Sequence, residues 1–329
     1  MEDNNNIAIS QAATERLLNV ISSRDHCDVL PTKEDLQKAN ASLSQHLPDQ
    51  GLGLEETTKH LLNEVAPGLN RSSLSATYYG FVTGGVTPAS RIADNIVSTY
   101  DQNVAVHLPE QTIATVVEDR ALQMLQELLE LDPSVWTSRT FTTGATASNV
   151  LGLACGRDAA LQLPHTNCDI SEIGILDACR LGNIKQIQVL TTMPHSSVLK
   201  AASIIGLGRA HVLNISQAED PLKFDFEKLV AEARANRTAS ILVVSCGEVS
   251  TGRFATEGFG EMQQLRHICD KYNIWMHVDG AFGIFARALE LGGKYDTIRR
   301  GCEGLELADS ITGDAHKLLN VVSRSDPYP

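Results

Sequence analysis

The sequence predicts an α/β fold in which a mainly parallel sheet carries helices on both faces. Three observations predict it. Short apolar, β-branched runs recur between residues 187 and 313, segments of helical periodicity separate them, and polar residues follow several of the runs. Parallel strands buried on both faces are continuous apolar runs, and helices are their usual connections. At 329 residues the chain is long enough for one large α/β domain with appendages.

The first part of the chain is predicted to be helical. Residues 1 to about 75 are polar and interrupted by prolines, so we expect only short helices there, for example over Glu55–Val65. Longer helices are predicted over Ala89–Tyr100, just after Pro88, and over Glu110–Leu131. In the last of these, apolar residues recur at spacings of three and four: Ile113, Val116, Val117, Ala121, Met124, Leu125 and Leu128.

From residue 148 onward, helices and strands alternate. The predicted helices cover Ser148–Leu163, Ser196–Ile205, Phe224–Asn236 and Glu257–Tyr272. The predicted strands cover Ile187–Thr191, Ala210–Ile215, Ile241–Ser245, Ile274–Asp279 and Ser310–Gly313. We divide the chain into an N-terminal helical segment (1–75), a large domain (76–320) and a tail (321–329). Ligands bind beyond the carboxyl ends of the strands in such sheets, so polar residues after strands are the candidates for a site.

Composition excludes several classes of protein. A formal net charge of −13 argues against a nucleic-acid partner. No run approaches the ~18 apolar residues of a membrane span, and the N-terminus lacks the basic region and apolar run of a secretory signal. The seven cysteines are scattered without C-x-x-C spacing. We therefore expect a cytoplasmic protein with reduced thiols and no metal site.

Two segments at predicted strand ends carry candidate chemistry. Thr142–Asn149 is a glycine- and hydroxyl-rich turn that opens a helix, an arrangement that binds phosphate. Its alternative is an ordinary helix cap, since Ser and Thr are preferred there. Asp279 directly follows a buried strand, where a carboxylate needs a cation or several donors. Gly280 and Ala281 would let a flat ring approach the backbone. The alternative is Asp279 as the cap of the next helix.

Two further residues complete the set. Lys317 follows the last predicted strand in the segment Asp314–Lys317. A lysine that condenses with a carbonyl needs a lowered pKa and hence a pocket, whereas most lysines are solvated surface charges. His195 follows the strand that ends at Thr191. Its imidazole either stacks on an aromatic ring or simply bonds the nearby backbone.

Together these residues match the needs of one cofactor, pyridoxal 5'-phosphate. It requires an anion cradle for its phosphate, a carboxylate for its ring nitrogen and a lysine for its aldehyde. All three occur here in α/β context, in the order Thr142–Asn149, Asp279 and Lys317.

At this point the chain resembles a known family, the group II pyridoxal-phosphate-dependent decarboxylases of fold type I. The family includes glutamate, aromatic-amino-acid, tyrosine and cysteine-sulfinate decarboxylases. The matching segments, in family order over about residues 75 to 320, are Tyr79–Gly85, Thr142–Asn149, His195–Ser197, His277–Ala281 and Asp314–Lys317. The resemblance implies the fold-type-I large domain.

The resemblance also implies catalytic roles for three residues. Lys317 is similar to the lysine that carries the cofactor as a Schiff base. Asp279 looks like the partner that keeps the ring nitrogen protonated. His195 looks like the residue stacked on one ring face, with Ala281 packed against the other.

Other positions look like further cofactor contacts. Ala145 and Thr146 resemble the phosphate-binding pair, and His316 is similar to a further phosphate contact. Thr251 resembles the threonine near the cofactor's ring hydroxyl.

The implied function is decarboxylation of an L-amino acid to an amine and CO2, in a homodimer. The alternatives are other fold-type-I chemistry (aldehyde synthase, aminotransferase or carbon–carbon lyase) and a non-catalytic protein that keeps the fold. Family members usually continue after the lysine into a mobile loop and a C-terminal small domain, whereas Val321–Pro329 looks unrelated. We therefore expect the small domain to be absent and turnover to be impaired.

Overall fold

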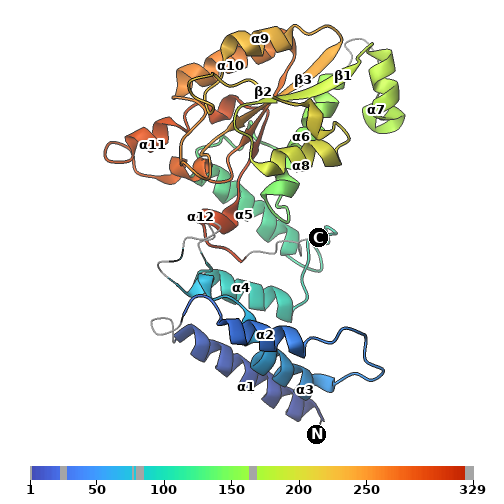
Figure 1. The fold of residues 1–329 in the computed structure, drawn as a ribbon, viewed down its shortest axis with the longest axis vertical. Coiled ribbons are helices and arrows are strands. Elements are labelled where there is room, and N and C mark those ends of the chain that lie inside the picture. Colours follow the sequence, from blue (N-terminus) through green and yellow to red (C-terminus); the bar gives the residue numbers. More distant parts are fainter. Residues whose placement is uncertain (1, 23–27, 76–77, 79–84, 163–168, 323–329) are drawn as a thin grey trace. The chain divides into compact units, whose positions relative to one another are not determined.

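The computed structural model describes residues 2–22, 28–75, 78, 85–162 and 169–322 (Figure 1). They form two compact units: the residues up to Ser90 together with Leu319–Val322, and Arg91–Leu318. The domain boundaries at residues 75 and 320 stay a prediction, because compactness alone does not show which part folds by itself. Among the described helices, none is long and apolar enough to cross a membrane.

The N-terminal unit is more helical than the sequence predicted. Helix α1 covers Glu2–Ser22, α2 covers Lys33–Ser42, and α3, Gly53–His60, continues as a π-helical turn over Leu61–Val65. Only the last two were expected. Polar residues dominate α1 and α2, so neither shows the apolar periodicity that marks a helix in a sequence. Tertiary contacts support α1 instead, since the Arg16 side chain donates to Leu62 O at 3.1 Å.

The second unit contains a five-stranded sheet whose strands are all parallel. The strands are β1 Gln186–Thr191, β2 Val212–Asn214, β3 Thr238–Ser245, β4 Trp275–Asp279 and β5 Ser310–Thr312. Their order in the sheet is β2-β1-β3-β4-β5. Ser245, Asp279 and Thr312 pair across the ends of β3, β4 and β5. The predicted α/β class and all five predicted strands are confirmed, with ends that shift by up to three residues.

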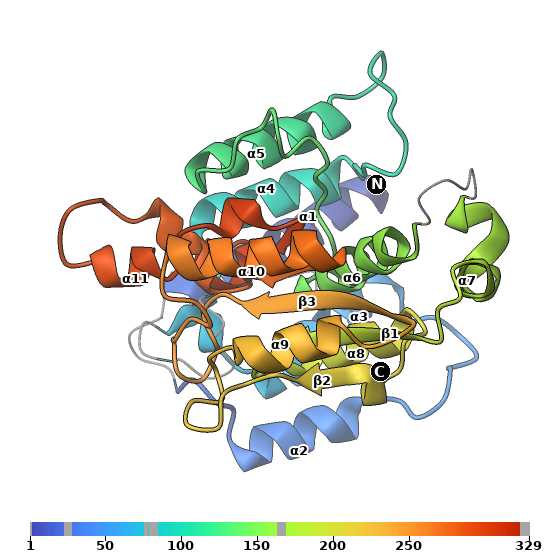
Figure 2. The same cartoon turned by 90° about the horizontal axis from the view of Figure 1, so that it is seen from above.

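Helices cover both faces of this sheet. Helix α6, Ala145–Leu161, and helix α8, Ser196–Ile204, pack on one face, where Leu153, Val198 and Ala201 meet the alternate residues of β1 and β3. The intervening strand residues are buried as well. Helices α9, Phe226–Ala233, and α10, Phe259–Tyr272, contact β3 and β4, and Figure 2 shows both beside β3.

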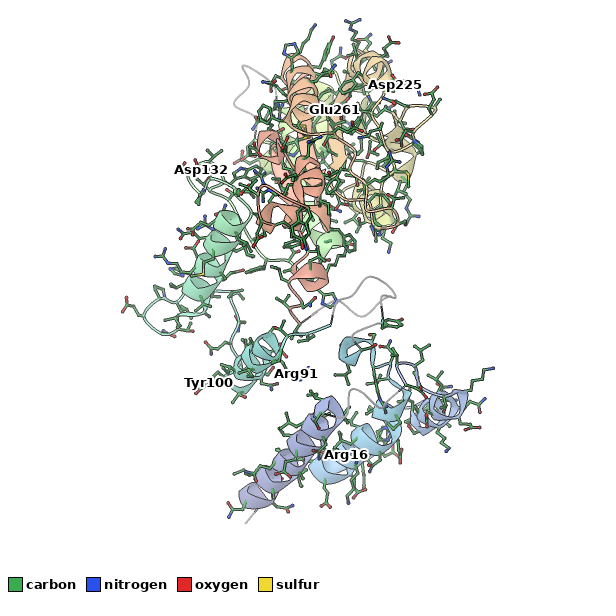
Figure 3. All side chains as sticks on the ribbon, turned by 90° about the vertical axis from the view of Figure 1, so that its left-hand side faces the viewer. Arg16, Arg91, Tyr100, Asp132, Asp225 and Glu261 are labelled. Atoms are coloured by element: carbon green, nitrogen blue, oxygen red, sulfur yellow. The ribbon has the colours of Figure 1, made fainter. Side chains whose placement is uncertain are left out.

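Side-chain hydrogen bonds lie at the start of two of these helices. The Asp225 carboxylate accepts hydrogen bonds from the backbone N–H groups of Glu227 and Lys228, both at 3.0 Å, at the start of α9. This cap satisfies two N–H groups that the helix leaves unpaired. Before α10, the Glu257 N–H donates at 2.7 Å to the carboxylate of Glu261 in the first turn. Figure 3 labels Asp225 and Glu261.

Five further helices complete the description: α4 Pro88–Thr99, α5 Ala114–Leu128, α7 Ile170–Leu181, α11 Asp296–Arg300 and α12 Ala315–Leu318. Helix α5 begins four residues later than predicted, because the Thr112 hydroxyl accepts the Ala114 N–H at 3.2 Å. Helix α7 was not predicted. Gly174, at φ 76°, interrupts it and breaks the apolar periodicity.

Two glycines let α6 lie close to the sheet. A Cβ built on Gly152 would lie 2.4 Å from Cε1 of His277, and one on Gly156 would lie 2.7 Å from Cδ1 of Trp275. Both rings project from β4 toward the helix. The glycines therefore make room for a histidine and a tryptophan beneath α6.

The substitution Gly152→Ala is expected to lower the free energy of unfolding by about 1–3 kcal/mol, because the added methyl overlaps the His277 ring. This is opposite to the gain of up to ~1 kcal/mol that alanine usually gives inside a helix. Urea denaturation measures the difference. The matched control is Gly260→Ala in α10, where a Cβ would meet nothing within 4 Å. Equal stability of Gly152→Ala and wild type would contradict the packing described.

Candidate active site

The predicted strand-end residues gather at the carboxyl edge of the sheet. Asp279 ends β4, and Lys317 lies in α12, five residues after β5 ends. His195 follows β1 and caps α8. Because all the described strands are parallel, their carboxyl ends face the same way, so these side chains share one edge.

Asp279 is held by two donors. One carboxylate oxygen accepts Nδ2 of Asn149 at 3.0 Å, and the other accepts the backbone N–H of Ala281 at 3.3 Å. The residue is half-buried, and Ala281 beside it is 8% exposed. Asp279 caps no α-helix, since a 3₁₀ segment, Gly283–Ala288, follows it. A carboxylate offers about four acceptor positions, so Asp279 can take a further donor.

Asn149 and His277 form a buried pair that the sequence did not single out as site residues. Asn149 is 0% exposed and His277 1%. His277 Nε2 lies 2.9 Å from Asn149 Oδ1, and its Nδ1 lies 2.8 Å from Ser310 Oγ. The signal for them was indirect: both polar residues lie within the segments Thr142–Asn149 and His277–Ala281, at positions that pattern alone treats as core.

His277 is expected to make stability depend on pH. Burial lowers its pKa from 6.5 to about 4, although the Asp279 charge raises it. Between those values the unfolded chain binds a proton that the folded protein does not. The free energy of unfolding is therefore expected to fall as the pH drops from about 6.5 to about 4, by up to roughly 3 kcal/mol.

Urea denaturation at several pH values measures this dependence. In the variant His277→Gln, the free energy of unfolding should no longer show the pH dependence that His277 causes. It should keep the dependence that carboxylates cause below pH ~5. Identical slopes for the variant and the wild type would show that His277 is not held neutral.

Lys317 is partly withdrawn from water. Its side chain is 20% exposed, and Nζ lies 3.8 Å from an Asp314 carboxylate oxygen and 3.9 Å from the centre of the Phe282 ring. Burial lowers the pKa of Lys317, while the charges of Asp314 and Asp279 raise it. The amine is therefore partly desolvated and within electrostatic reach of Asp279. Asp314 and Phe282 were not among the predicted site residues.

The first turn of α6 is open toward the same edge. The Thr142 hydroxyl donates to Gly144 O at 2.9 Å and lies 2.7 Å from the Ser148 hydroxyl. No side chain caps this 17-residue helix, so the alternative of an ordinary side-chain cap is not realised. A Cβ built on Gly144 would meet nothing within 4 Å. Ala145 and Thr146 belong to the turn, and Thr146 is exposed.

His195 is exposed and bonds the start of α8. Its Nδ1 accepts the Ser197 N–H at 3.2 Å and lies 2.9 Å from the Ser197 hydroxyl. Ser197 also lies 3.1 Å from Asn149 Nδ2, so a hydrogen-bonded path connects His195 to Asp279. The backbone contact considered as the alternative is thus present, and it leaves the ring exposed.

Two other predicted residues make local contacts. Thr251 is exposed in the turn after β3, where its N–H donates to Glu248 at 2.8 Å and its hydroxyl accepts the Arg253 N–H at 3.2 Å. His316 is half-buried and donates its backbone N–H to Asp314 at 3.2 Å. The resembling segment Tyr79–Gly85 lies outside the described residues except for Gly85.

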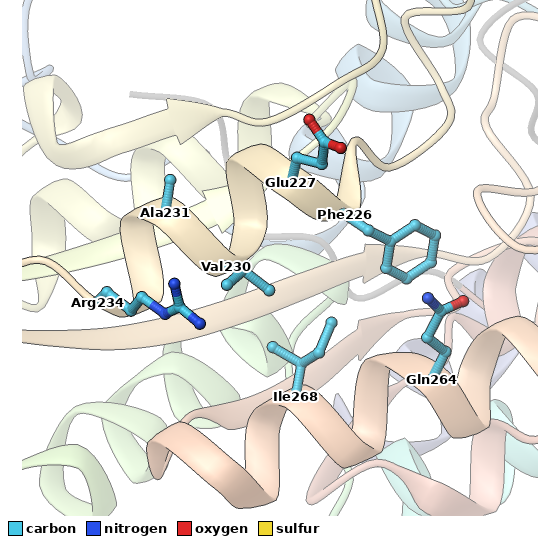
Figure 4. A pocket seen from close by; sticks show the side chains of 7 residues that line it. All are labelled: Phe226, Glu227, Val230, Ala231, Arg234, Gln264 and Ile268. Carbon is cyan, nitrogen blue, oxygen red and sulfur yellow. The ribbon is translucent and has the colours of Figure 1, made fainter.

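A separate groove lies between α9 and α10. Figure 4 shows Val230 and Ile268 facing one another across it. The residues that line it are Phe226, Glu227, Val230, Ala231, Arg234, Gln264 and Ile268. None of the predicted site residues is among them, so the groove is distinct from the edge described above.

Comparisons with known proteins concern the family and the fold. Residues 37–324 match the family described as "Pyridoxal-dependent decarboxylase conserved domain". The L-2,4-diaminobutyrate decarboxylase of Acinetobacter baumannii is 22% identical over 321 residues, which are 96% of this chain and 60% of that protein. The chain thus spans less than two thirds of the length of this relative.

Solved structures show the same fold. The crystal structure of mouse CSAD gives a TM-score of 0.72 at 20% identity, covering 96% of this chain and 62% of that one. The structure of Oryza sativa TDC with PLP and tryptamine gives 0.70 at 22% identity, covering 95% and 63%. These likenesses show the fold of the large domain.

Proposed function

Because the chain belongs to the pyridoxal-dependent decarboxylase family, we propose that it binds pyridoxal 5'-phosphate and releases CO2 from an L-amino acid. One observation carries the proposal. A partly desolvated lysine amine, Lys317, lies within electrostatic reach of the half-buried carboxylate of Asp279 at the carboxyl edge of the sheet. The name of the Acinetobacter baumannii relative, L-2,4-diaminobutyrate decarboxylase, supports the reaction class.

The residues present fit the cofactor. It needs an amine, an anion cradle and a carboxylate, and the edge offers Lys317, the uncapped first turn of α6 and Asp279. The open space in front of Gly144 leaves room for an anion at that turn. Ala145, Thr146 and His316 would hold the phosphate.

The resemblance to the family implies the remaining roles. When bound, the cofactor ring accepts the electron pair that remains when CO2 departs. Asp279, as an acceptor, holds the proton on the ring nitrogen. His195 and Ala281 would lie on the two ring faces, and Thr251 near the ring hydroxyl. Lys317 would hold the cofactor through its amine, which burial makes easier to deprotonate.

We also propose that the protein acts as a homodimer. Apolar side chains stay exposed on α4 and α5 and on the residues next to them, among them Ile92, Ile96, Tyr100, Ile113 and Met124, at 54–71%. A second copy that covers them would remove this surface from water. Sedimentation is expected to show a dimer, and Met124→Lys should weaken it at least tenfold because it places a charge in the contact. An unchanged dimer in that variant would exclude this surface.

A cytoplasmic location is proposed on thiol usage. Cys246 and Cys302 are buried with sulfur atoms 3.7 Å apart and are both free. Such thiols persist in a reducing compartment.

Titration of the purified protein with pyridoxal 5'-phosphate tests the function. We expect the visible absorbance band of lysine-bound cofactor, followed by CO2 release from at least one member of an L-amino-acid panel that includes L-2,4-diaminobutyrate. A keto acid or an aldehyde as product would instead identify aminotransferase or aldehyde synthase chemistry. A folded protein that gives no band would reject the proposal in favour of a non-catalytic role.

A further inference from the structure

A continuous path of hydrogen bonds crosses the buried face of the sheet behind Asp279. Successive donor–acceptor distances along it are 2.9, 2.8, 2.9, 3.1 and 2.9 Å. A branch of 3.0 Å reaches Asp279 from Asn149. The members, in order, are Trp275, Ser310, His277, Asn149, Ser197 and His195. The path thus connects Asp279, proposed to hold the ring nitrogen, with His195, proposed to lie on a ring face.

The direction of the path is fixed at Asn149, whose amide oxygen can only accept. Trp275 Nε1 can only donate, so the Ser310 oxygen accepts from it. His277 is neutral at neutral pH because burial lowers its pKa to about 4. Its single ring hydrogen lies on Nε2, which faces Asn149 Oδ1, and its Nδ1 accepts the Ser310 hydroxyl. His277 therefore donates to Asn149 Oδ1, with a longer contact of 3.5 Å to Thr312.

The Asp279 branch fixes the amide of Asn149 independently. If the amide were turned over, its oxygen would face the carboxylate of Asp279, and two acceptors would meet without a hydrogen. The amide NH2 therefore faces both Asp279 and Ser197. The Ser197 oxygen accepts one of these hydrogens, which leaves its own hydrogen for His195 Nδ1.

His195 is the far end of the path. Its Nδ1 accepts the Ser197 hydroxyl at 2.9 Å and the Ser197 backbone N–H at 3.2 Å. A nitrogen that accepts two donors carries no hydrogen itself, so the neutral ring has its hydrogen on Nε2.

We propose that Asn149 is a positioning residue, which orients the Asp279 carboxylate and the His195 imidazole through one amide and, with its neighbours, holds both His195 and His277 in the Nε2–H form. The proposal rests on the proposed function for what the two oriented groups do. It does not depend on that function for the arrangement itself. Replacing the amide is expected to disturb both groups together, since its NH2 bonds Asp279 directly and reaches His195 through the Ser197 hydroxyl.

The histidine forms are tested on the full chain without cofactor. Long-range ¹H–¹⁵N spectra of the ¹⁵N-histidine protein at neutral pH distinguish a ring nitrogen that carries hydrogen from one that does not. The protein has ten histidines. The signals of His195 and His277 are identified as those that disappear in His195→Gln and in His277→Gln, respectively. We expect both rings to carry hydrogen on Nε2. An Nδ1–H form of either ring would overturn the proposal.

The positioning role is tested with the near-isosteric variant Asn149→Leu. Its affinity for pyridoxal 5'-phosphate is expected to fall at least tenfold, and the ring-nitrogen signals of His195 and His277 should both move. The matched control is Gln188→Leu, which removes another buried amide, one that donates to Ser240 and Glu232 in the same unit. The control should leave the affinity and both signals unchanged. Wild-type affinity in folded Asn149→Leu would overturn the positioning role.

A second variant covers the case in which Asn149→Leu does not fold. Ser197→Ala cuts the path between Asn149 and His195 but keeps the bonds to Asp279 and His277. We expect only the His195 signal to move, and movement of neither signal would contradict the path. If the wild type shows the expected histidine forms but binds no cofactor, the proposed function fails and the hydrogen-bond path stands.

Discussion

Substitution of Lys317 by methionine is expected to abolish covalent capture of pyridoxal 5'-phosphate. Reduction of the wild-type mixture with borohydride should leave the cofactor attached to Lys317, because burial keeps a larger fraction of this amine uncharged than of a solvated lysine. Methionine keeps an unbranched side chain of similar length but removes the amine, whose Nζ lies 3.9 Å from the centre of the Phe282 ring. Peptide mass spectrometry measures the attached fraction, and any CO2 release should fall at least 10³-fold.

A second lysine gives the matched control. Lys223 is 13% exposed and forms an ion pair of 3.0 Å with Glu257 in the same unit. Lys223→Met should keep covalent capture at Lys317 at the wild-type level. Attachment that persists at equal yield in Lys317→Met, on another lysine, would show that the edge of the sheet does not select Lys317.

The second large effect is expected for Asp279→Asn. The asparagine keeps the shape of the carboxylate, but it loses the charge and presents an NH2 group where an acceptor is needed. A hydrogen bond to a charged group contributes about 1.5–3 kcal/mol, which corresponds to a loss of roughly 10–150-fold in cofactor affinity, with a further loss in the rate of CO2 release. The absorbance titration and single-turnover CO2 measurements separate the two losses.

The matched control for this variant is Asp225→Asn at the start of α9. Asparagine caps helices about as well as aspartate, so both stability and cofactor affinity should stay unchanged. Cofactor affinity of Asp279→Asn within twofold of the wild type would mean that the carboxylate does not face the ring nitrogen.

The sequence was sufficient to predict the sheet. The run Ile241–Val244 is apolar throughout and lies between Ser240 and Ser245, so burial on both faces of this strand could be predicted from the sequence alone. It was insufficient for α1 and α2, whose residues bury little apolar surface. It also missed α7, where the glycine at position 174 breaks the period.

The residues of the candidate site likewise divide into those that the sequence predicted and those that it did not. Lys317 and Asp279 could be selected because their residue types follow strands, and topology then brings them to one edge. Asn149 and His277 could not be selected by that reasoning. They lie inside regular elements, on a helix and a strand far apart in the sequence, and their partnership depends on the close approach that Gly152 permits.

Helix α6 also fixes a distance within the candidate site, between its opening turn and Asn149. Asn149, which donates to Asp279, is the fifth residue of this helix, so the helix rises about 6 Å from its first residue, Ala145, to Asn149. The opening turn and the residue that orients Asp279 thus belong to one helix that packs on the sheet. For the cofactor site proposed above, an analogue with one extra methylene between ring and phosphate is expected to lose either the contact with the opening turn or the contact with Asp279.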